Sequence, residues 1–594
     1  MRRLAALSLA AAVLVMTGVA GASHGPGAEV TVGSDDTTPL QNKQNEPAVA
    51  VNPIDHNIVA AGANDNIDLE GCNNGADNTC PFTDGVGVSG VQFSLDGGAS
   101  WVQPTYTGYS ARLCKGVAGT STDSCPTSTF ENGPIGTLPW YWENGLVSDG
   151  DPAVVFGPKP DADGDFSWAN GARLYYANLT SNFSTRRGEQ EFKGFEAIAV
   201  SRTDDAVAAA AGGAAGKAAW MPPVIVTKQS SATFSDKEFI YADNAASSPF
   251  FGNVYICNAS FRSVGGPPEP IVFSRSTDGG DTWTTRQITP AANTNLGHGR
   301  QGCTVRTDSG GVVYVFYRGG ATGKPQEPPL VNRAILMVRS FDGGVTFDRP
   351  RPVAQTNECG LFDPVQGRLT FDGVAGARTN IGPMADIANG NPTGYAQPHN
   401  DAIVLAWCDG PTPSASAPGA NEEAFVQWST DRGETWSAPV NAAPASDRPD
   451  FPAVAISPDG TDVYVTYMNF LQPWQPRIDT PARTMQGVVR YSSFPPAAFA
   501  DRFRGTTGDA RGSTANGLST EFLGDYNYVW ATNSKAVAVW NDVRHALQCP
   551  AIDTWRQTVV DGAPTTPPAP ATCPFALPDF FFGNSDIYST VATP

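Results

Sequence analysis

The sequence predicts an all-β protein built from an internal repeat. The pattern Ser-x-Asp-x-Gly-x-x-aromatic occurs four times, at residues 94–101, 276–283, 340–347 and 429–436, and each copy follows a short apolar run. Asp and Ser side chains can bond the backbone of their own turn, Gly tolerates a positive φ, and the aromatic residue anchors the returning strand. Each copy therefore predicts a β-hairpin turn. Four copies in one chain indicate a repeat architecture.

The repeated octet resembles the Asp-box, or BNR repeat, of sialidases and related secreted β-propellers. The resemblance implies that each box lies on the turn between the third and fourth strands of a propeller blade, away from the catalytic face. It also implies a structural role for the box. The strongest motif of the chain therefore predicts the architecture and not the chemistry.

A second repeat alternates with the first and predicts the inner strands. Residues 46–51, 151–156 and 451–456 share the form acidic or aromatic residue, Pro-Ala, then an apolar run, and looser copies begin near residues 237, 302, 383 and 523. Apolar runs of this length suit buried strands. Two inner strands and two outer strands that carry the box make a four-stranded blade.

The blade count is predicted as six or seven, with seven preferred. Seven units begin near residues 46, 151, 236, 300, 379, 450 and 521, and a degenerate box followed by an Ala/Gly run (206–219) marks the second. Sialidases of the resembling family have six blades, so seven is a departure, and a terminal unit that shared strands would restore six. No helical periodicity is found, so we expect no helix.

The start of the chain and its cysteines predict export. Residues 1–22 have a basic start, a short apolar run and a small-residue cleavage site, which is typical of a signal peptide. We expect a leader at residues 23–45 and one propeller domain at 46–594, secreted into the extracellular space. Ten cysteines then favour disulfides. We expect local bridges Cys72–Cys80, Cys114–Cys125 and Cys549–Cys573, with Cys257, Cys303, Cys359 and Cys408 pairing across blades.

The net charge of −20 argues against nucleic acid and against an anionic membrane surface as partners. No apolar stretch is long enough to cross a membrane. A local basic pocket would be needed to bind an anionic sugar. We expect an extracellular glycan or glycoprotein as the partner, and no oligomeric state is predicted.

Acidic residues at the starts of the inner strands form the candidate site. In a propeller these positions surround the central channel at one face, where carboxylates could act as general acid and base or hold a cation. Alternatively, each carboxylate caps backbone amides or pairs with an Arg of the next blade. Asp236 and Asp450 share such positions. The candidate catalytic residues are Glu46, Asp151, Glu238 and Asp525, followed by Tyr526 and Arg300.

The residues fit a sialidase only in part. The resemblance implies three arginines on the substrate carboxylate, a Tyr nucleophile activated by Glu, and an Asp acid. Residues 23–93 contain no arginine, although the first arginine of the family precedes the first box. Tyr588-Ser589 resembles the nucleophile strand, but the sequence ends six residues later. Arg300, Arg378 and Arg544 lie near inner-strand ends without forming a motif.

The sequence is therefore compatible with two functions. The first is a secreted sialidase-like glycoside hydrolase, of the exo-α-sialidase type or a diverged relative, acting on extracellular glycans from the central face. The alternative is a non-catalytic glycan- or protein-binding adhesion propeller, so whether the chain is an enzyme stays open. No cofactor is expected. The one alternative is calcium at the loop 161–165, whose three aspartates also suit a polar hairpin.

Overall fold

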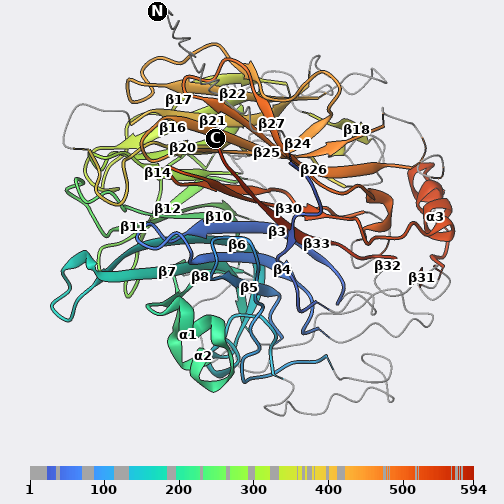
Figure 1. The fold of residues 1–594 in the computed structure, drawn as a ribbon, viewed down its shortest axis with the longest axis horizontal. Coiled ribbons are helices and arrows are strands. Elements are labelled where there is room, and N and C mark those ends of the chain that lie inside the picture. Colours follow the sequence, from blue (N-terminus) through green and yellow to red (C-terminus); the bar gives the residue numbers. More distant parts are fainter. Residues whose placement is uncertain are drawn as a thin grey trace, which may run out of the picture.

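The computed structural model is a seven-bladed β-propeller (Figure 1). It describes residues 23–34, 41–69, 86–112, 133–182, 196–227, 232–262, 268–291, 302–320, 333–357, 359–363, 368–370, 377–379, 382–395, 401–410, 422–472, 477, 479, 482–514, 518, 521–563, 565–568, 573, 575–576 and 580–594. The predicted all-β fold and the preference for seven blades are confirmed.

The blades are antiparallel sheets, and the strands of each blade follow one another from the channel outward. They are, in order, β3 (Gln44–Val51), β4 (Val59–Asp65) and β5 (Ser89–Ser94); β6 (Leu146–Pro160), β7 (Phe166–Asn182), β8 (Ala197–Thr203) and β9 (Trp220–Ile225); β10 (Phe234–Ala242), β11 (Val254–Phe261), β12 (Ile271–Ser276) and β13 (Thr284–Gln287); β14 (Thr304–Thr307), β15 (Val313–Gly320), β16 (Arg333–Ser340) and β17 (Arg351–Thr356); β20 (Met384–Ile387), β21 (Ile403–Asp409), β22 (Glu423–Ser429) and β23 (Val440–Asn441); β24 (Pro449–Ile456), β25 (Asp462–Phe470), β26 (Thr484–Ser493) and β27 (Ala500–Arg504); and β29 (Tyr528–Ala531), β30 (Ala536–Asp542), β33 (Asp586–Ala592) and β2 (Ala28–Glu29).

The ring is complete. The first strand of each blade contacts the first strand of the next, and β29 of blade 7 contacts β3 of blade 1. Figure 1 shows β3 beside β30 and β33, at the junction between the two ends of the chain. In blade 1 the fourth strand is reduced to a bridge between Phe93 and Val102.

The N-terminal segment closes the ring. Strand β2 pairs antiparallel with β33 and is the outermost strand of blade 7. Strand β1 (Ser23–His24) pairs parallel with β27 on the outside of blade 6. Blade 7 is thus built from both ends of the chain. The two ends of the chain therefore share one blade, and the number of blades is still seven, not the six that such sharing was expected to give.

The four Asp-boxes form the same turn. In the second copy the Ser276 hydroxyl bonds Asp278 Oδ1 at 2.7 Å, and Asp278 Oδ1 accepts the Thr282 amide at 2.9 Å. Gly280, at φ 89°, donates its amide to Ser276 Oγ at 2.8 Å. Equivalent bonds occur in the other three copies. Most of the box's polar groups are used within the turn, which is the structural role expected.

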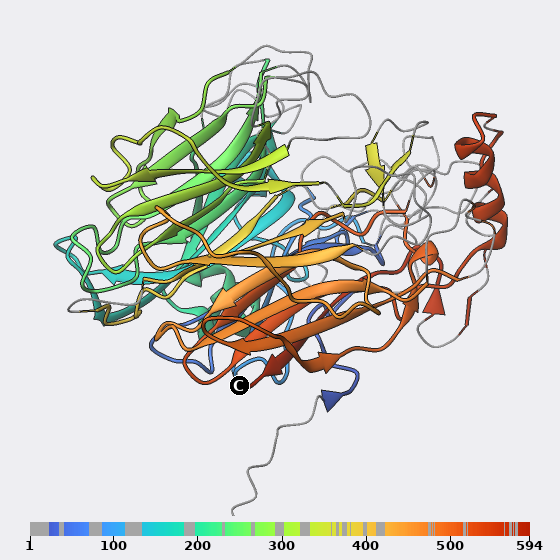
Figure 2. The same ribbon diagram turned by 90° about the horizontal axis from the view of Figure 1, so that it is seen from above.

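Three helices correct the expectation of an all-strand chain. The Ala/Gly run between β8 and β9 forms α1 (Ala206–Ala211) and α2 (Gly213–Ala219), and Asp205 caps α1 by accepting the Ala208 amide. Alanine has the highest helix propensity, and short Ala-rich helices need no amphipathic period to form. Helix α3 (Pro550–Val560) lies at the periphery (Figure 2).

Smaller elements decorate the ring. They are the hairpins β18 (Leu361–Asp363) with β19 (Arg368–Thr370) and β31 (Phe575–Ala576) with β32 (Phe580–Phe581), the strand β28 (Gly508–Asp509), and two 3-10 turns, Trp142–Asn144 and Ala510–Gly512. Among the described residues, none of the helices has the length and apolarity that a bilayer span requires.

Three disulfides occur among the described residues. Cys549–Cys573 is the local bridge expected beside α3, Cys257–Cys303 joins blades 3 and 4 as expected, and Cys359–Cys408 joins the segment after β17 to β21 of blade 5. Cys72, Cys80, Cys114 and Cys125 lie outside the described residues. The three bridges indicate an oxidising, non-cytoplasmic environment.

Candidate functional site

A shared backbone feature places side chains at one end of the channel. Glu46, Asp151, Lys237 and Phe451 lie in the first half of the inner strands of blades 1, 2, 3 and 6, and all four have positive φ, between 51° and 55°. The register of each inner strand shifts at this position, which marks a bulge. A non-Gly residue in this conformation costs on the order of 1–3 kcal/mol and persists only where its surroundings hold it.

Lys237 is the centre of a buried charge cluster. Its Nζ lies 3.1 Å from Asp151 Oδ2 and 3.4 Å from Glu46 Oε1, and it forms an ion pair with Asp525 Oδ2. Arg378 Nε lies 2.6 Å from the other oxygen of Asp525. The Lys237 and Asp525 side chains are almost fully buried, whereas the Arg378 side chain is 37% exposed. The cluster therefore reaches solvent through Arg378.

Asn64 of β4 connects the first two blades beneath this cluster. Its Nδ2 donates to Glu46 Oε2 and to Asn45 Oδ1, both at 2.8 Å. Its Oδ1 accepts the backbone amide of Asp151 at 2.7 Å. The side-chain amide of Asn64 thus holds both bulged positions, Glu46 and Asp151, which explains how two strained residues are kept side by side.

The environment separates the pKa values of neighbouring carboxyl groups. Burial, followed by the charge of Asp151, raises the pKa of Glu46 well above its ordinary value. Burial also acts against ionisation of Asp151, but Lys237 and a hydrogen bond from Glu46 hold its pKa well below the ordinary value. For Asp525 the same burial is outweighed by Arg378 and Lys237, so its pKa is lowered. The cluster then contains two carboxylates and two cations, and its charge balances.

Glu238 is a second protonated acid beside the cluster. Burial and then Asp151 raise its pKa well above the ordinary value. The residue is 6% exposed, and neither of its carboxyl oxygens has a hydrogen-bond partner in the described structure. An unsatisfied buried carboxyl group is costly, so it is a marker for function rather than stability.

A small cavity opens beside Lys237 on the side of blades 4 and 5. Its volume is about 50 Å³, enough for a few water molecules. Blades 4 and 5 carry Gly302 and Gly382 before their inner strands, and the position where a Cβ of Gly382 would stand lies 2.7 Å from Gly302 Cα. The cavity is also lined by Lys237, Glu238, Asp525 and Tyr526.

The channel is filled below this level. Arg306 of β14 bonds Asp386 Oδ1 at 3.0 Å, and its guanidinium lies 4.7 Å from the ring centre of Phe239 and 4.8 Å from that of Tyr241. Phe239 in turn stacks on Tyr528, with 5.5 Å between ring centres. The Lys237 cluster therefore lies above a solid floor.

The family comparison agrees with the architecture. The BNR/Asp-box repeat family matches residues 427–438, which include the fourth octet. The chain is a β-propeller that carries Asp-box (BNR) repeats. No curated protein sequence matches this propeller.

Several solved structures are similar to the propeller at low identity. The leech intramolecular trans-sialidase is 14% identical over 72% of this chain and 65% of its own, with a TM-score of 0.36. The intramolecular trans-sialidase of Ruminococcus gnavus is 11% identical over 73% of this chain and 93% of its own, with a TM-score of 0.37. The phage phi92 endosialidase is 11% identical over 95% of this chain and 68% of its own, with a TM-score of 0.38.

The structure brings most of the predicted site residues together. Glu46, Asp151 and Asp525 meet at Lys237, and Glu238 lines the adjoining cavity. The Tyr526 hydroxyl donates to the Pro152 carbonyl at 3.3 Å, and the ring centre lies 5.7 Å from Lys237 Nζ. Arg300 lies outside the described residues.

Other candidates lie apart from the cluster or beside it. Burial raises the pKa of Asp236 to about 7, and this residue directly precedes Lys237. Asp450 lies 3.5 Å from Cys359 Sγ and away from Lys237. In the loop 161–165, Asp161 Oδ1 accepts two backbone amides at 3.0 Å, as in the polar-hairpin alternative.

Two of the three arginines near inner-strand ends, Arg378 and Arg544, lie within the described residues, and these two do not meet. Arg378 belongs to the cluster, whereas Arg544 pairs with Asp542 at 2.7 Å and lies against Tyr588. The Tyr588 hydroxyl bonds Glu29 of β2 at 3.2 Å, outside the channel.

Lys237 is the central residue that sequence reasoning missed. The predicted site consists mainly of acidic residues, and Lys237 takes the position of Glu46 and Asp151 in blade 3 with the opposite charge. Aligning the loose copy 237–240 with the copies at 46 and 151 by position, not by charge, would have found it.

Proposed function

We propose that this propeller is a secreted glycoside hydrolase that acts on extracellular glycans from the channel face, with α-sialosides as the first substrates to test. The observation that carries the proposal is the Glu46–Asp151 pair, whose pKa values are pushed apart within one hydrogen-bonded unit. Neighbouring carboxyls with opposed pKa values are how one site supplies both an acid and a base. The fold alone carries no function.

In this proposal Glu46 holds the proton that the leaving oxygen of the glycoside takes up as the glycosidic bond breaks. Asp151 stays ionised beside Lys237 and steadies positive charge that develops on the sugar. A water molecule then supplies the new hydroxyl group and gives its other proton to Glu46, which restores the acid. Tyr526, with its hydroxyl at Pro152, borders the same space and is the second residue to test.

Supporting proposals concern the chain as a whole. Residues 1–22 would be the signal peptide and residues 46–594 one domain, to which the leader 23–45 contributes β1, β2 and the start of β3. The three disulfides support export because they form in oxidising compartments.

A non-catalytic glycan- or protein-binding propeller is the second candidate. It is favoured by the balanced charges at Lys237 and by the cavity of about 50 Å³, which accepts water but no sugar ring without rearrangement. A binder needs no separated acid and base. The two candidates therefore differ in whether substitution of Glu46 changes turnover.

The deciding experiment is hydrolysis of a fluorogenic α-sialoside, together with a panel of other aryl glycosides, by the mature protein. Glu46→Gln, Asp151→Asn and Tyr526→Phe should each reduce kcat by about 10²-fold or more, the range of general acid–base catalysis. Glu521→Gln is the matched control, because Glu521 is a buried carboxyl paired with Arg556 at 3.0 Å, beside α3. Absence of turnover on every glycoside, with glycan binding retained, would decide for the binding propeller.

A further inference from the structure

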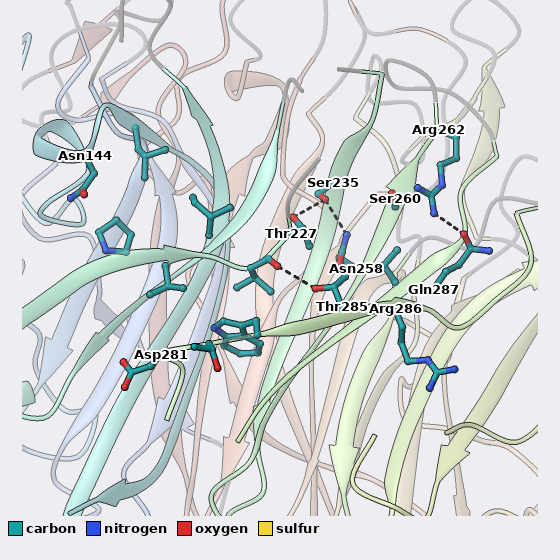
Figure 3. A pocket seen from close by; sticks show the side chains of 18 residues that line it. Asn144, Thr227, Ser235, Asn258, Ser260, Arg262, Asp281, Thr285, Arg286 and Gln287 are labelled. Carbon is teal, nitrogen blue, oxygen red and sulfur yellow. Dashed lines mark hydrogen bonds between the residues drawn. The ribbon is translucent and has the colours of Figure 1, made fainter. Parts of the chain in front are cut away.

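A large groove lies between the outer halves of blades 2 and 3, away from the Lys237 cluster. Its volume is about 920 Å³, within the range of small-ligand sites (Figure 3). One wall comes from β9 and the residues that follow it, and the other from β10 to β13. The groove shares no lining residue with the cavity at Lys237.

The groove has an apolar side and a hydrogen-bonding side. Pro223, Val224 and Ile225 of β9 are partly exposed along one wall. The half-buried indole of Trp283, the aromatic residue of the second Asp-box, lines the groove too, although its Nε1 is bonded to Gly280. On the other wall the side chains are mostly hydroxyls, amides and guanidinium groups, namely Ser235, Asn258, Ser260, Arg262, Thr285, Arg286 and Gln287, and Thr227 of the first wall faces them.

Hydrogen bonds across the blade boundary hold the polar wall in place. Thr285 Oγ1 donates to the Val226 carbonyl of blade 2 at 3.2 Å. Asn258 Nδ2 donates to Ser235 Oγ at 3.3 Å, and the Ser235 and Thr227 hydroxyls lie 3.4 Å apart. Figure 3 shows the side chains of Thr227, Ser235, Asn258 and Thr285 grouped together. The site is therefore preformed, which lowers the entropic cost of binding.

The charge of the groove opposes that of the whole chain. Arg262 Nη2 donates to Gln287 Oε1 at 2.7 Å, and Figure 3 shows Gln287 between Arg262 and Arg286. The only carboxylate among the described lining residues is Asp281, which is already paired with Arg202. Two arginines, Arg262 in the groove and Arg286 at its rim, thus line the groove of a protein whose net charge is −20. Such a local basic site selects an anionic ligand.

We propose that this groove binds an acidic oligosaccharide, with sugar rings against Trp283 and the β9 wall, hydroxyls on Thr285 and Gln287, and a carboxylate on Arg262 and Arg286. Aromatic faces suit the apolar faces of sugars, and guanidinium groups suit carboxylates. The groove extends the protein's contact with a glycan beyond the channel. It does not rest on hydrolysis, because none of the channel carboxyls takes part.

The test is isothermal titration of the mature protein with hexagalacturonate, maltohexaose and a hexaglutamate peptide, at low and at high salt. Hexagalacturonate should bind, and more weakly at high salt, whereas the neutral maltohexaose should not. Arg286→Gln and Arg262→Gln should each weaken hexagalacturonate binding about tenfold, and the double variant should abolish it. Arg477→Gln is the matched control, because it removes the same charge from a side chain that is 48% exposed and outside the groove.

The outcomes separate this site from the channel. Binding that both groove variants leave unchanged, or that Arg477→Gln weakens equally, would overturn the proposal, as would absence of hexagalacturonate binding. Equal binding of hexaglutamate would assign the groove to acidic peptides instead. If the Glu46→Gln variant loses hydrolysis but keeps hexagalacturonate binding, the groove binds its ligand independently of the channel, as proposed.

Discussion

Replacing Lys237 with methionine should destabilise the propeller more than any other single loss of a lysine in its described part. Lys237 Nζ contacts Asp151 and Asp525, both held ionised, and also protonated Glu46. Methionine keeps most of the unbranched length of the side chain and removes the charge. Asp151 then loses its cation, while Asp525 retains Arg378 at 2.6 Å.

The magnitude follows from the burial of the groups left behind. Removing one partner of a buried ion pair costs about 3–5 kcal/mol, because the remaining charge is uncompensated. We expect a loss of this size in the free energy of unfolding at pH 7. Lys217→Met is the matched control, because Lys217 is as buried as Lys237 but its partner Glu143 is 37% exposed. Its loss should stay near 0–1 kcal/mol.

The cost should depend on pH in a defined direction. In the wild type the pKa values of Asp151 and Asp525 are lowered, so their contribution is present above pH 4 and is lost as the pH falls further. Without Lys237, burial raises the pKa of Asp151, and protonation of Asp151 relieves the unpaired charge. The difference between the wild type and the variant should therefore be largest at pH 7 and shrink toward pH 4.

Urea unfolding followed by tryptophan fluorescence at pH 7, 5.5 and 4.5 measures this difference from the transition midpoints. The double variant Lys237→Met with Asp151→Asn should recover part of the loss, since it removes the unpaired anion. A loss no larger than that of Lys217→Met, or one that does not change with pH, would refute the charge balance deduced for the cluster.

Three further outcomes are expected. Burial raises the pKa of Glu29 to about 7, so the folded state holds a proton that the unfolded chain releases near pH 4.5. The midpoint temperature of thermal unfolding should therefore fall as the pH rises from 5 to 8, and this fall should be smaller in the Glu29→Gln variant. Asp342→Ala removes the acceptor of the Thr346 amide and hydroxyl, at 2.8 and 2.6 Å, and should cost about 1–3 kcal/mol in urea unfolding while hexagalacturonate binding stays unchanged. Replacing Cys257 and Cys303 with serine opens a loop of 46 residues and should cost about 2–4 kcal/mol, which non-reducing calorimetry would detect.

The parts of the fold that could be predicted are those encoded locally. Each Asp-box forms its turn through bonds within eight residues, as between Ser276, Asp278 and Thr282, so the motif specifies the turn by itself. The inner strands β3 and β6 contain the predicted starts Glu46-Pro47 and Asp151-Pro152 but begin earlier, at Gln44 and Leu146. By contrast, β2 is two residues long and has no signal of its own, because its strand pairing with β33 depends on the other end of the chain.

The site was predicted only in part because its contacts cross the ring. Arg378 bonds Asp525, 147 residues later, and Lys237 reaches Glu46, 191 residues earlier. A single sequence gives the positions at the strand starts but not which of them face one another. The sign of the charge also changes from blade to blade, so a search for acidic residues alone finds the anions and misses the cation that organises them.

The bulged positions favour a functional cluster over a structural plug. Blade 4 carries a glycine, Gly302, before its inner strand, and glycine adopts the positive φ found there without strain. Glu46, Asp151 and Lys237 adopt the same conformation at a cost on the order of 1–3 kcal/mol each. Their ion pairs give little net stability in return, since apolar residues often replace buried pairs at no loss. Stability alone would therefore favour glycine or apolar residues at these positions, and the three charged side chains are better explained by a task that needs a proton and a charge at the channel mouth.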